Sequence, residues 1–189
     1  MKSRSQDPLR LDVAAFAAEG GELAGQWPGS SLERLAGSQS PPQDTPIADV
    51  EWRAAGERRP VTGGEPELWL QLSARTPVWL TCQRCLQPMQ EPLAIDCRLR
   101  FVRGEAEAEA LDAELEDDVL ALPRWLDLRE LVEDELLLAL PLVPRHERCP
   151  TPLQFDEGPA GGDEAEIEER PNPFAALEAL KKGRSTSGG

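Results

Sequence analysis

Alternation of apolar and polar residues dominates the middle of the chain. From residue 68 to 82 the even positions share one largely apolar character, and from 93 to 101 the odd positions take it over. A period of two is typical of a strand with one buried face. With a similar run further upstream, the pattern predicts strands near 47–55, 66–82 and 90–102. The second and third are joined by a tight turn and should form a hairpin.

A proline interrupts the longest of these runs. Pro77 has no backbone N–H, so it cannot donate the hydrogen bond that an interior strand needs. The strand is therefore expected to be bent, bulged or exposed at an edge near this residue.

A different period begins after residue 127. Between 128 and 140 apolar side chains recur at spacings of three and four, which is typical of an amphipathic helix. Asp127 can cap its first turn. The apolar stripe consists of Leu128, Leu131, Val132, Leu136, Ala139 and Leu140. On the other side lie Glu130, Glu133 and Asp134, for which a solvated polar face is the simplest interpretation.

These elements predict the α+β class, with an antiparallel β-sheet or partial barrel packed against one long helix. The core domain should span residues 47–149. Residues 1–46 should form a lead-in with a short helix, because Ser30 and Glu33 have the spacing of a capping box.

The C-terminal part changes in composition. Residues 150–170 are rich in Gly, Pro and acidic side chains, which indicates a disordered acidic linker. Residues 171–182 predict a short amphipathic helix, and 183–189 a flexible tail. The candidate partner-binding residues of this helix are Phe174, Leu177, Leu180 and Lys181.

The chain is strongly acidic, with a net charge of −15 and a sequence pI of about 4.5. Residues 105–118 alone hold eight acidic side chains and no basic one. This balance argues against a general nucleic-acid binder, which neutralises phosphates with clustered Lys and Arg. No apolar run is long enough for a membrane span, so a cytoplasmic protein is expected.

The four cysteines of the chain are candidates for metal binding or for redox chemistry. Cys82 and Cys85 form a C-x-x-C pair, and His146 and Cys149 form a second pair with three-residue spacing. Together they would make a Cys₃His zinc site, with zinc as the candidate cofactor. A cytosolic chain of this size uses cysteines as thiols or ligands rather than as a disulfide scaffold.

Two alternatives to zinc remain. A thioredoxin-like redox pair requires a helix N-terminus, whereas this pair follows one strand pattern and precedes another. Reduced thiols without a ligand are also compatible with the sequence. Cys97 shares a face with Ile95 and Leu99 and is most simply a buried core residue.

Four segments together resemble the YceD family of large ribosomal RNA subunit accumulation proteins. They are "CQRC", "VEDELLLALPLVPRH", "HERC" and "NPFAALEALKK", in this order. The resemblance extends from about residue 9 to 182. It implies a non-enzymatic bacterial cytoplasmic protein needed for synthesis, processing or accumulation of large-subunit ribosomal RNA. It brings no catalytic residues.

The leading hypothesis is therefore a ribosome-biogenesis factor that acts by binding ribosome-assembly components or ribosomal RNA, directly or indirectly. No membrane and no small-molecule substrate are expected. One alternative is a zinc-binding or redox-active cysteine protein. Another is a direct RNA-binding module that uses basic residues along the hairpin, with Trp79 available for base stacking. Those basic residues are Arg84, Arg98, Arg100 and Arg103.

Overall fold

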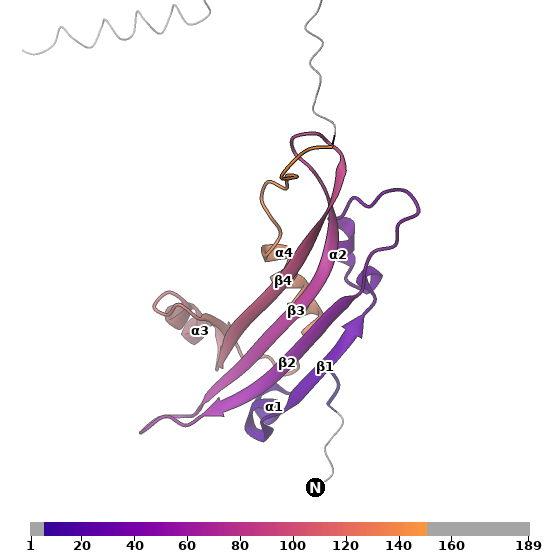
Figure 1. The fold of residues 1–189 in the computed structure, drawn as a ribbon. Helices are drawn as coiled ribbons and strands as arrows, with labels where there is room; N and C mark the ends of the chain where they lie inside the picture. The colour runs from indigo at the N-terminus through magenta and orange to yellow at the C-terminus, as the bar shows by residue number, and fades with distance from the viewer. Residues whose placement is uncertain (1–5, 151–189) are drawn as a thin grey trace, which may run out of the picture. The chain divides into compact units, whose positions relative to one another are not determined.

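The computed structural model describes residues 6–150 of the chain (Figure 1). This part contains one open sheet with strand order β1-β2-β3-β4-β5. The strands are β1 (Glu22–Trp27), β2 (Val50–Arg59), β3 (Glu67–Thr81), β4 (Pro88–Val102) and β5 (Asp118–Ala121). The helices of the described part are α1 (Val13–Glu19), the 3₁₀ turn η1 (Gly29–Ser31), α2 (Glu33–Gly37), α3 (Glu105–Asp112) and α4 (Leu128–Leu138). None of them is long and apolar enough to cross a bilayer.

The α+β class and the three predicted strands are confirmed, but the sheet differs from the expectation. β5 runs parallel to β4, whereas the other neighbours are antiparallel, so the sheet is mixed and is not a barrel. β1 lies within the stretch expected to be a lead-in, and it pairs with β2. Its side chains are mostly exposed, so it lacks the apolar alternation that predicted the other strands.

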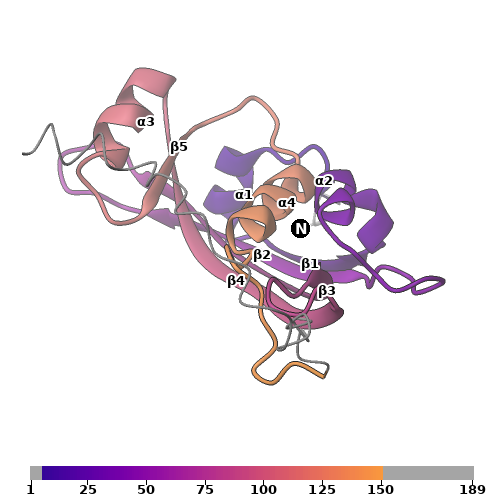
Figure 2. The ribbon, with the colours of Figure 1, turned by 90° about the horizontal axis from the view of Figure 1, so that it is seen from above.

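The core lies on one face of the sheet. Figure 2 shows α1, α2 and α4 together over this face. Gly56 of β2 has no side chain where α1 crosses the strand, and a Cβ there would lie 2.9 Å from the backbone of Ala17. Several apolar side chains are entirely buried between the helices and the sheet, each worth roughly 1.5–3 kcal/mol. They include Phe16, Leu35, Leu70, Leu72, Leu99, Leu128 and Leu136.

The predicted long helix is shorter than expected. α4 has 11 residues and ends at Leu138, before the predicted end at residue 140. Asp127 caps it as predicted, because its carboxylate accepts hydrogen bonds from the N–H groups of Arg129 and Glu130. The predicted apolar stripe is confirmed for Leu128, Leu131, Val132 and Leu136, which are all buried. It is wrong for Ala139 and Leu140, which follow the end of the helix and are exposed and half-buried.

The predicted capping box is wrong, and the reason involves α4. α2 starts after Leu32, which offers no side-chain cap. Glu133 of α4 supplies it, since its Oε1 accepts from the N–H groups of Arg34 at 2.7 Å and Leu35 at 3.0 Å. The other oxygen of Glu133 pairs with the Arg34 guanidinium at 3.0 Å. Glu133 is therefore a buried tertiary cap and not part of a solvated face.

Pro77 lies where β3 becomes an edge strand, as the sequence indicated. The pairing of β3 with β2 covers β3 only as far as Arg75. Two residues beyond Pro77, Trp79 turns its N–H to Gln39 Oε1 at 3.0 Å and accepts from the Ser40 N–H at 2.8 Å. Residues two apart in a strand present their backbone groups to the same side. The missing N–H of Pro77 therefore faces away from β4, so no bond in the β3–β4 ladder is lost.

Substitutions on α4 test this packing. Leu136→Asp should prevent folding, because it places a carboxylate at a position with 0% exposure. Leu136→Ala should lower the free energy of unfolding by roughly 2–5 kcal/mol. Leu138→Asp is the matched control, since Leu138 is 81% exposed on the same helix. Thermal unfolding followed by circular dichroism measures all three. An unchanged melting temperature for Leu136→Asp would contradict the core assignment.

Candidate metal centre

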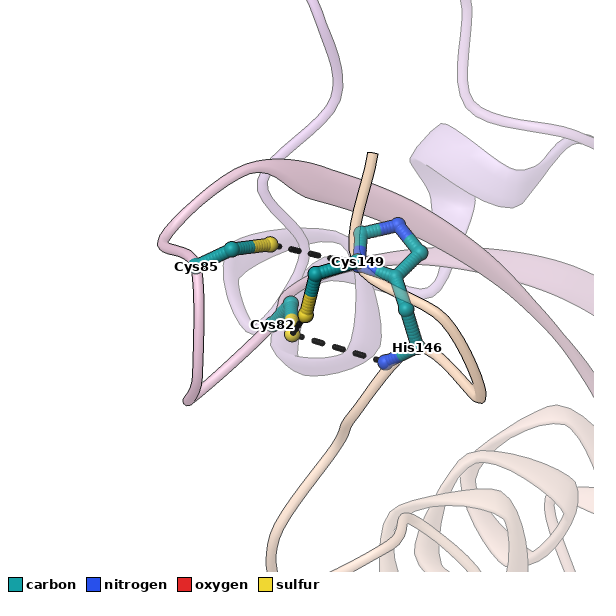
Figure 3. A group of neighbouring side chains, drawn as sticks. All are labelled: Cys82, Cys85, His146 and Cys149. Atoms are coloured by element: carbon teal, nitrogen blue, oxygen red, sulfur yellow. Dashed lines mark hydrogen bonds between the residues drawn. The ribbon is translucent and has the colours of Figure 1, made fainter. Parts of the chain in front are cut away.

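The turn of the β3–β4 hairpin holds the first cysteine pair. Cys82 donates its N–H to the Gln87 carbonyl at 3.0 Å, and the Leu86 N–H donates to the Cys82 carbonyl at 2.9 Å. Leu86 has a φ of 57°, a left-handed conformation that closes the turn. Both cysteines are buried, and the turn aims them at one side of the hairpin tip (Figure 3).

The chain after α4 brings the second pair to the same place. The Gln83 N–H donates to the Pro144 carbonyl at 2.8 Å, which fastens residues 139–150 to the hairpin tip. His146 and Cys149 follow directly, and both side chains are half-buried. Segments more than sixty residues apart in sequence are thus joined at one site.

The four candidate ligands form one cluster. Their ligand atoms all lie within 4.8 Å of one another. The sulfurs of Cys82 and Cys149 are 4.0 Å apart, and the Cys85 sulfur lies 3.4 Å from His146 Nδ1. Ligands of a tetrahedral zinc, with bonds of about 2.3 Å to sulfur and about 2.0 Å to nitrogen, are about 3.5–3.8 Å apart. The cluster has the dimensions of a metal site.

The surroundings of Cys82 suit a thiolate. Burial alone would raise the pKa of this thiol, but N–H groups of His146, Cys85 and Arg84 point at the sulfur and lower the pKa to about 5. The His146 and Arg84 nitrogens lie 3.4 and 3.5 Å from it. Such donors commonly surround metal-bound ligands and fix their orientation.

The thiol of Cys149, in contrast, has a raised pKa. Burial and the neighbouring sulfurs of Cys85 and Cys82 raise the pKa of its thiol to about 11. Crowded sulfurs resist losing further protons unless a cation offsets the charge, and a divalent ion does so. The four residues are therefore placed where they could hold a metal ion, whose binding would have to displace the proton of Cys149. The redox alternative finds no support, because the pair lies between two strands rather than at a helix N-terminus.

Cys97 lies outside the cluster. It is half-buried rather than fully buried, and its sulfur points to the Leu72 carbonyl at 3.7 Å. Burial, together with the carboxylates of Glu135, Asp118 and Asp96, raises the pKa of its thiol to about 12. It is a protonated side chain packed against the core.

The basic residues predicted for RNA contact do not form one free stripe. Arg100 pairs with Glu67 at 3.2 Å, and the guanidinium of Arg98 lies 4.8 Å from the centre of the Trp69 ring. Arg103 pairs with a glutamate of the β2–β3 loop at 3.4 Å. Arg84 is exposed at the opposite end of the hairpin.

Two exposed arginines were missed by the sequence pattern. Arg145 and Arg148 flank His146 at the hairpin tip. The short motif "PRHERC" could have revealed them, since each is adjacent to a candidate ligand. The candidate partner-binding residues Phe174, Leu177, Leu180 and Lys181 lie outside the described residues.

Comparison with known proteins confirms the resemblance. The family model described as "Large ribosomal RNA subunit accumulation protein YceD" matches residues 70–181, a stretch that includes all four clustered residues. The chain belongs to the YceD family. A YceD protein with that same description, from Haemophilus influenzae, is 30% identical over 175 residues, which cover 93% of this chain and 96% of the relative. No solved structure matches the chain.

Titration with cobalt(II) tests the cluster in this YceD-family protein. The metal-free protein should develop thiolate–cobalt charge-transfer bands and the intense visible absorption of a tetrahedral site, saturating at one equivalent. Cys149→Ser should reduce or shift these bands, because it removes one thiolate. Cys97→Ser is the matched control and should titrate like the wild type, since Cys97 lies outside the cluster. Spectra of octahedral cobalt in the wild type would refute the site.

Proposed function

We propose that this protein acts in the bacterial cytoplasm to support the synthesis, processing or accumulation of large-subunit ribosomal RNA, and that it does so by binding rather than by catalysis. The observation that carries this proposal is membership of the YceD family, with a relative similar along 93% of the chain. The family description names accumulation of the RNA and no reaction.

Zinc is the proposed occupant of the cluster, in a structural role. Three sulfurs and one imidazole nitrogen are the donors that zinc prefers over magnesium or calcium. Four protein ligands fill a tetrahedral shell, whereas catalytic zinc keeps one position open for water or substrate. The ion would fasten the segment after α4 to the hairpin tip, in addition to the backbone hydrogen bond between Gln83 and Pro144.

Deletion of the gene tests the proposed function. The ratio of mature large-subunit to small-subunit ribosomal RNA should fall in the deletion strain, because the proposed factor supports only the larger RNA. Expression of the wild-type chain should restore the ratio. Capillary electrophoresis of total RNA measures it. An unchanged ratio after deletion would refute the function.

Truncation after Glu169 tests the proposed partner-binding segment. The compact unit that contains the sheet spans Met1–Leu153, so the truncated protein should keep the wild-type melting temperature. Loss of Phe174, Leu177, Leu180 and Lys181 should reduce its ability to restore the RNA ratio, since these residues are the proposed anchors for an assembly partner. A chain truncated after Lys182 is the control. Full activity of the shorter chain would make the segment dispensable.

A further inference from the structure

Charge is unevenly distributed over the described part of this acidic chain. The acidic run at 105–118 forms α3 and leads into β5, and both lie at the end of β4 away from the hairpin turn (Figure 1). At roughly 3.3 Å per residue, the fifteen residues of β4 separate α3 from the turn by about 45 Å. Screening acts over about 8 Å at physiological ionic strength, so this run does not neutralise the hairpin tip.

The hairpin tip itself is basic. We define it as residues 82–87 and 144–150, which contain Arg84, Arg145 and Arg148 against the single acid Glu147. All three arginines are exposed, and none forms an ion pair with any residue between 6 and 150. The formal charge of the tip is therefore +2 with neutral thiols. A zinc ion with three thiolates contributes −1, so the tip remains positive with the metal bound.

The cluster of Cys82, Cys85, His146 and Cys149 brings the segments that carry these arginines together. Arg84 lies between Cys82 and Cys85, whereas Arg145 precedes His146 and Arg148 follows it. The Gln83–Pro144 hydrogen bond places the backbones next to Arg84 and Arg145 within 2.8 Å. Cations from segments sixty residues apart are thereby held on one small surface.

Exposed apolar side chains adjoin the same arginines in sequence. Leu86 in the turn is 64% exposed, Leu142 is 100% exposed and Val143 is 52% exposed. Exposed apolar side chains that adjoin one another and lie beside exposed arginines are common where a partner binds. Such side chains can pack against bases that have left a stack, while arginines contact the phosphates.

The sheet offers a weaker alternative surface. Four of its arginines are already engaged, with Arg59, Arg75 and Arg100 in ion pairs and Arg98 on the Trp69 ring, whereas Arg53 and Arg58 are exposed. A phosphate would have to compete with a carboxylate for three of these side chains. No carboxylate between residues 6 and 150 pairs with the arginines of the hairpin tip, so a phosphate there meets no such competitor from this part of the chain.

We infer that the metal-held hairpin tip binds RNA, with Arg84, Arg145 and Arg148 contacting phosphates of a single-stranded or loop region. This inference rests on the proposed function and names the partner of the protein. The zinc ion positions the three arginines and takes no part in chemistry. An acidic protein surface would present the same sign of charge as RNA. The test must therefore distinguish RNA from an acidic protein partner.

Fluorescence anisotropy tests the inference with the full-length, zinc-loaded protein and a labelled RNA hairpin carrying a single-stranded extension. The full chain is used because seven acidic residues follow the tip between 151 and 170. The tip variant combines Arg84→Gln, Arg145→Gln and Arg148→Gln. It should bind about tenfold more weakly, and its slope of log affinity against log salt should fall by about 2, since each lost phosphate contact removes about 0.7.

A matched sheet variant removes the same charge elsewhere, through Arg53→Gln, Arg58→Gln and Arg98→Gln, three exposed arginines of β2 and β4. It should bind RNA within about threefold of the wild type, because a change in net charge alone acts weakly through screening salt. Both variants should retain their zinc, since none of the six residues belongs to the cluster. Their melting temperatures should change little, because all six side chains are exposed. Equal losses in the two variants would overturn the inference.

Two further outcomes would also overturn it. Poly-glutamate competing as well as unlabelled RNA would indicate an acidic protein partner, and wild-type affinity of the tip variant would exclude the tip. In the latter case the tip variant would also restore the RNA ratio in the deletion strain, and the proposed function would stand. An unchanged ratio on deletion would reject the function itself, whatever the binding data show.

Discussion

The pairing of β3 with β4 is the constraint on which the rest of the structure depends. The two strands pair over fourteen positions, from Leu68 opposite Phe101 to Thr81 opposite Pro88. A slip of one residue would turn Leu70 and its neighbours to the open face. The same register decides where the turn falls, and so it places Cys82 and Cys85 at the hairpin tip. Core burial and the candidate metal site are two consequences of one strand pairing.

α4 positions the second half of the cluster, His146 and Cys149, relative to the sheet. Its buried stripe packs on the sheet, and Glu133 ties it to the start of α2 through a carboxylate that satisfies two backbone N–H groups. Leaving those groups unpaired in a partly buried place would cost roughly 1–3 kcal/mol. With α4 fixed in this way, only seven residues separate its end from His146. The segment therefore needs little further ordering to reach the hairpin tip.

Sequence alone predicted what depends on local pattern. Period-two alternation identified β2, β3 and β4, and the two short spacings identified all four clustered residues. It missed β1 because an edge strand with mostly exposed side chains has no apolar alternation. It misread Glu133 because the groups that this carboxylate caps lie 98 and 99 residues away. Partners so distant in sequence leave no periodic signal.

Net charge has a related limit as a predictor, since it averages over features that the fold separates. The value of −15 argued against nucleic-acid binding, yet eight of the acidic side chains belong to one run at the far end of the longest strands. Electrostatic attraction between a protein and a polyanion is local, because salt screens it within about a nanometre. What matters is the sign of the surface charge within that distance of the contact. At the hairpin tip that sign is set by three arginines, which lie next to the Cys₃His cluster on two separate segments. An acidic chain can therefore carry a basic binding surface wherever tertiary contacts concentrate its few cations.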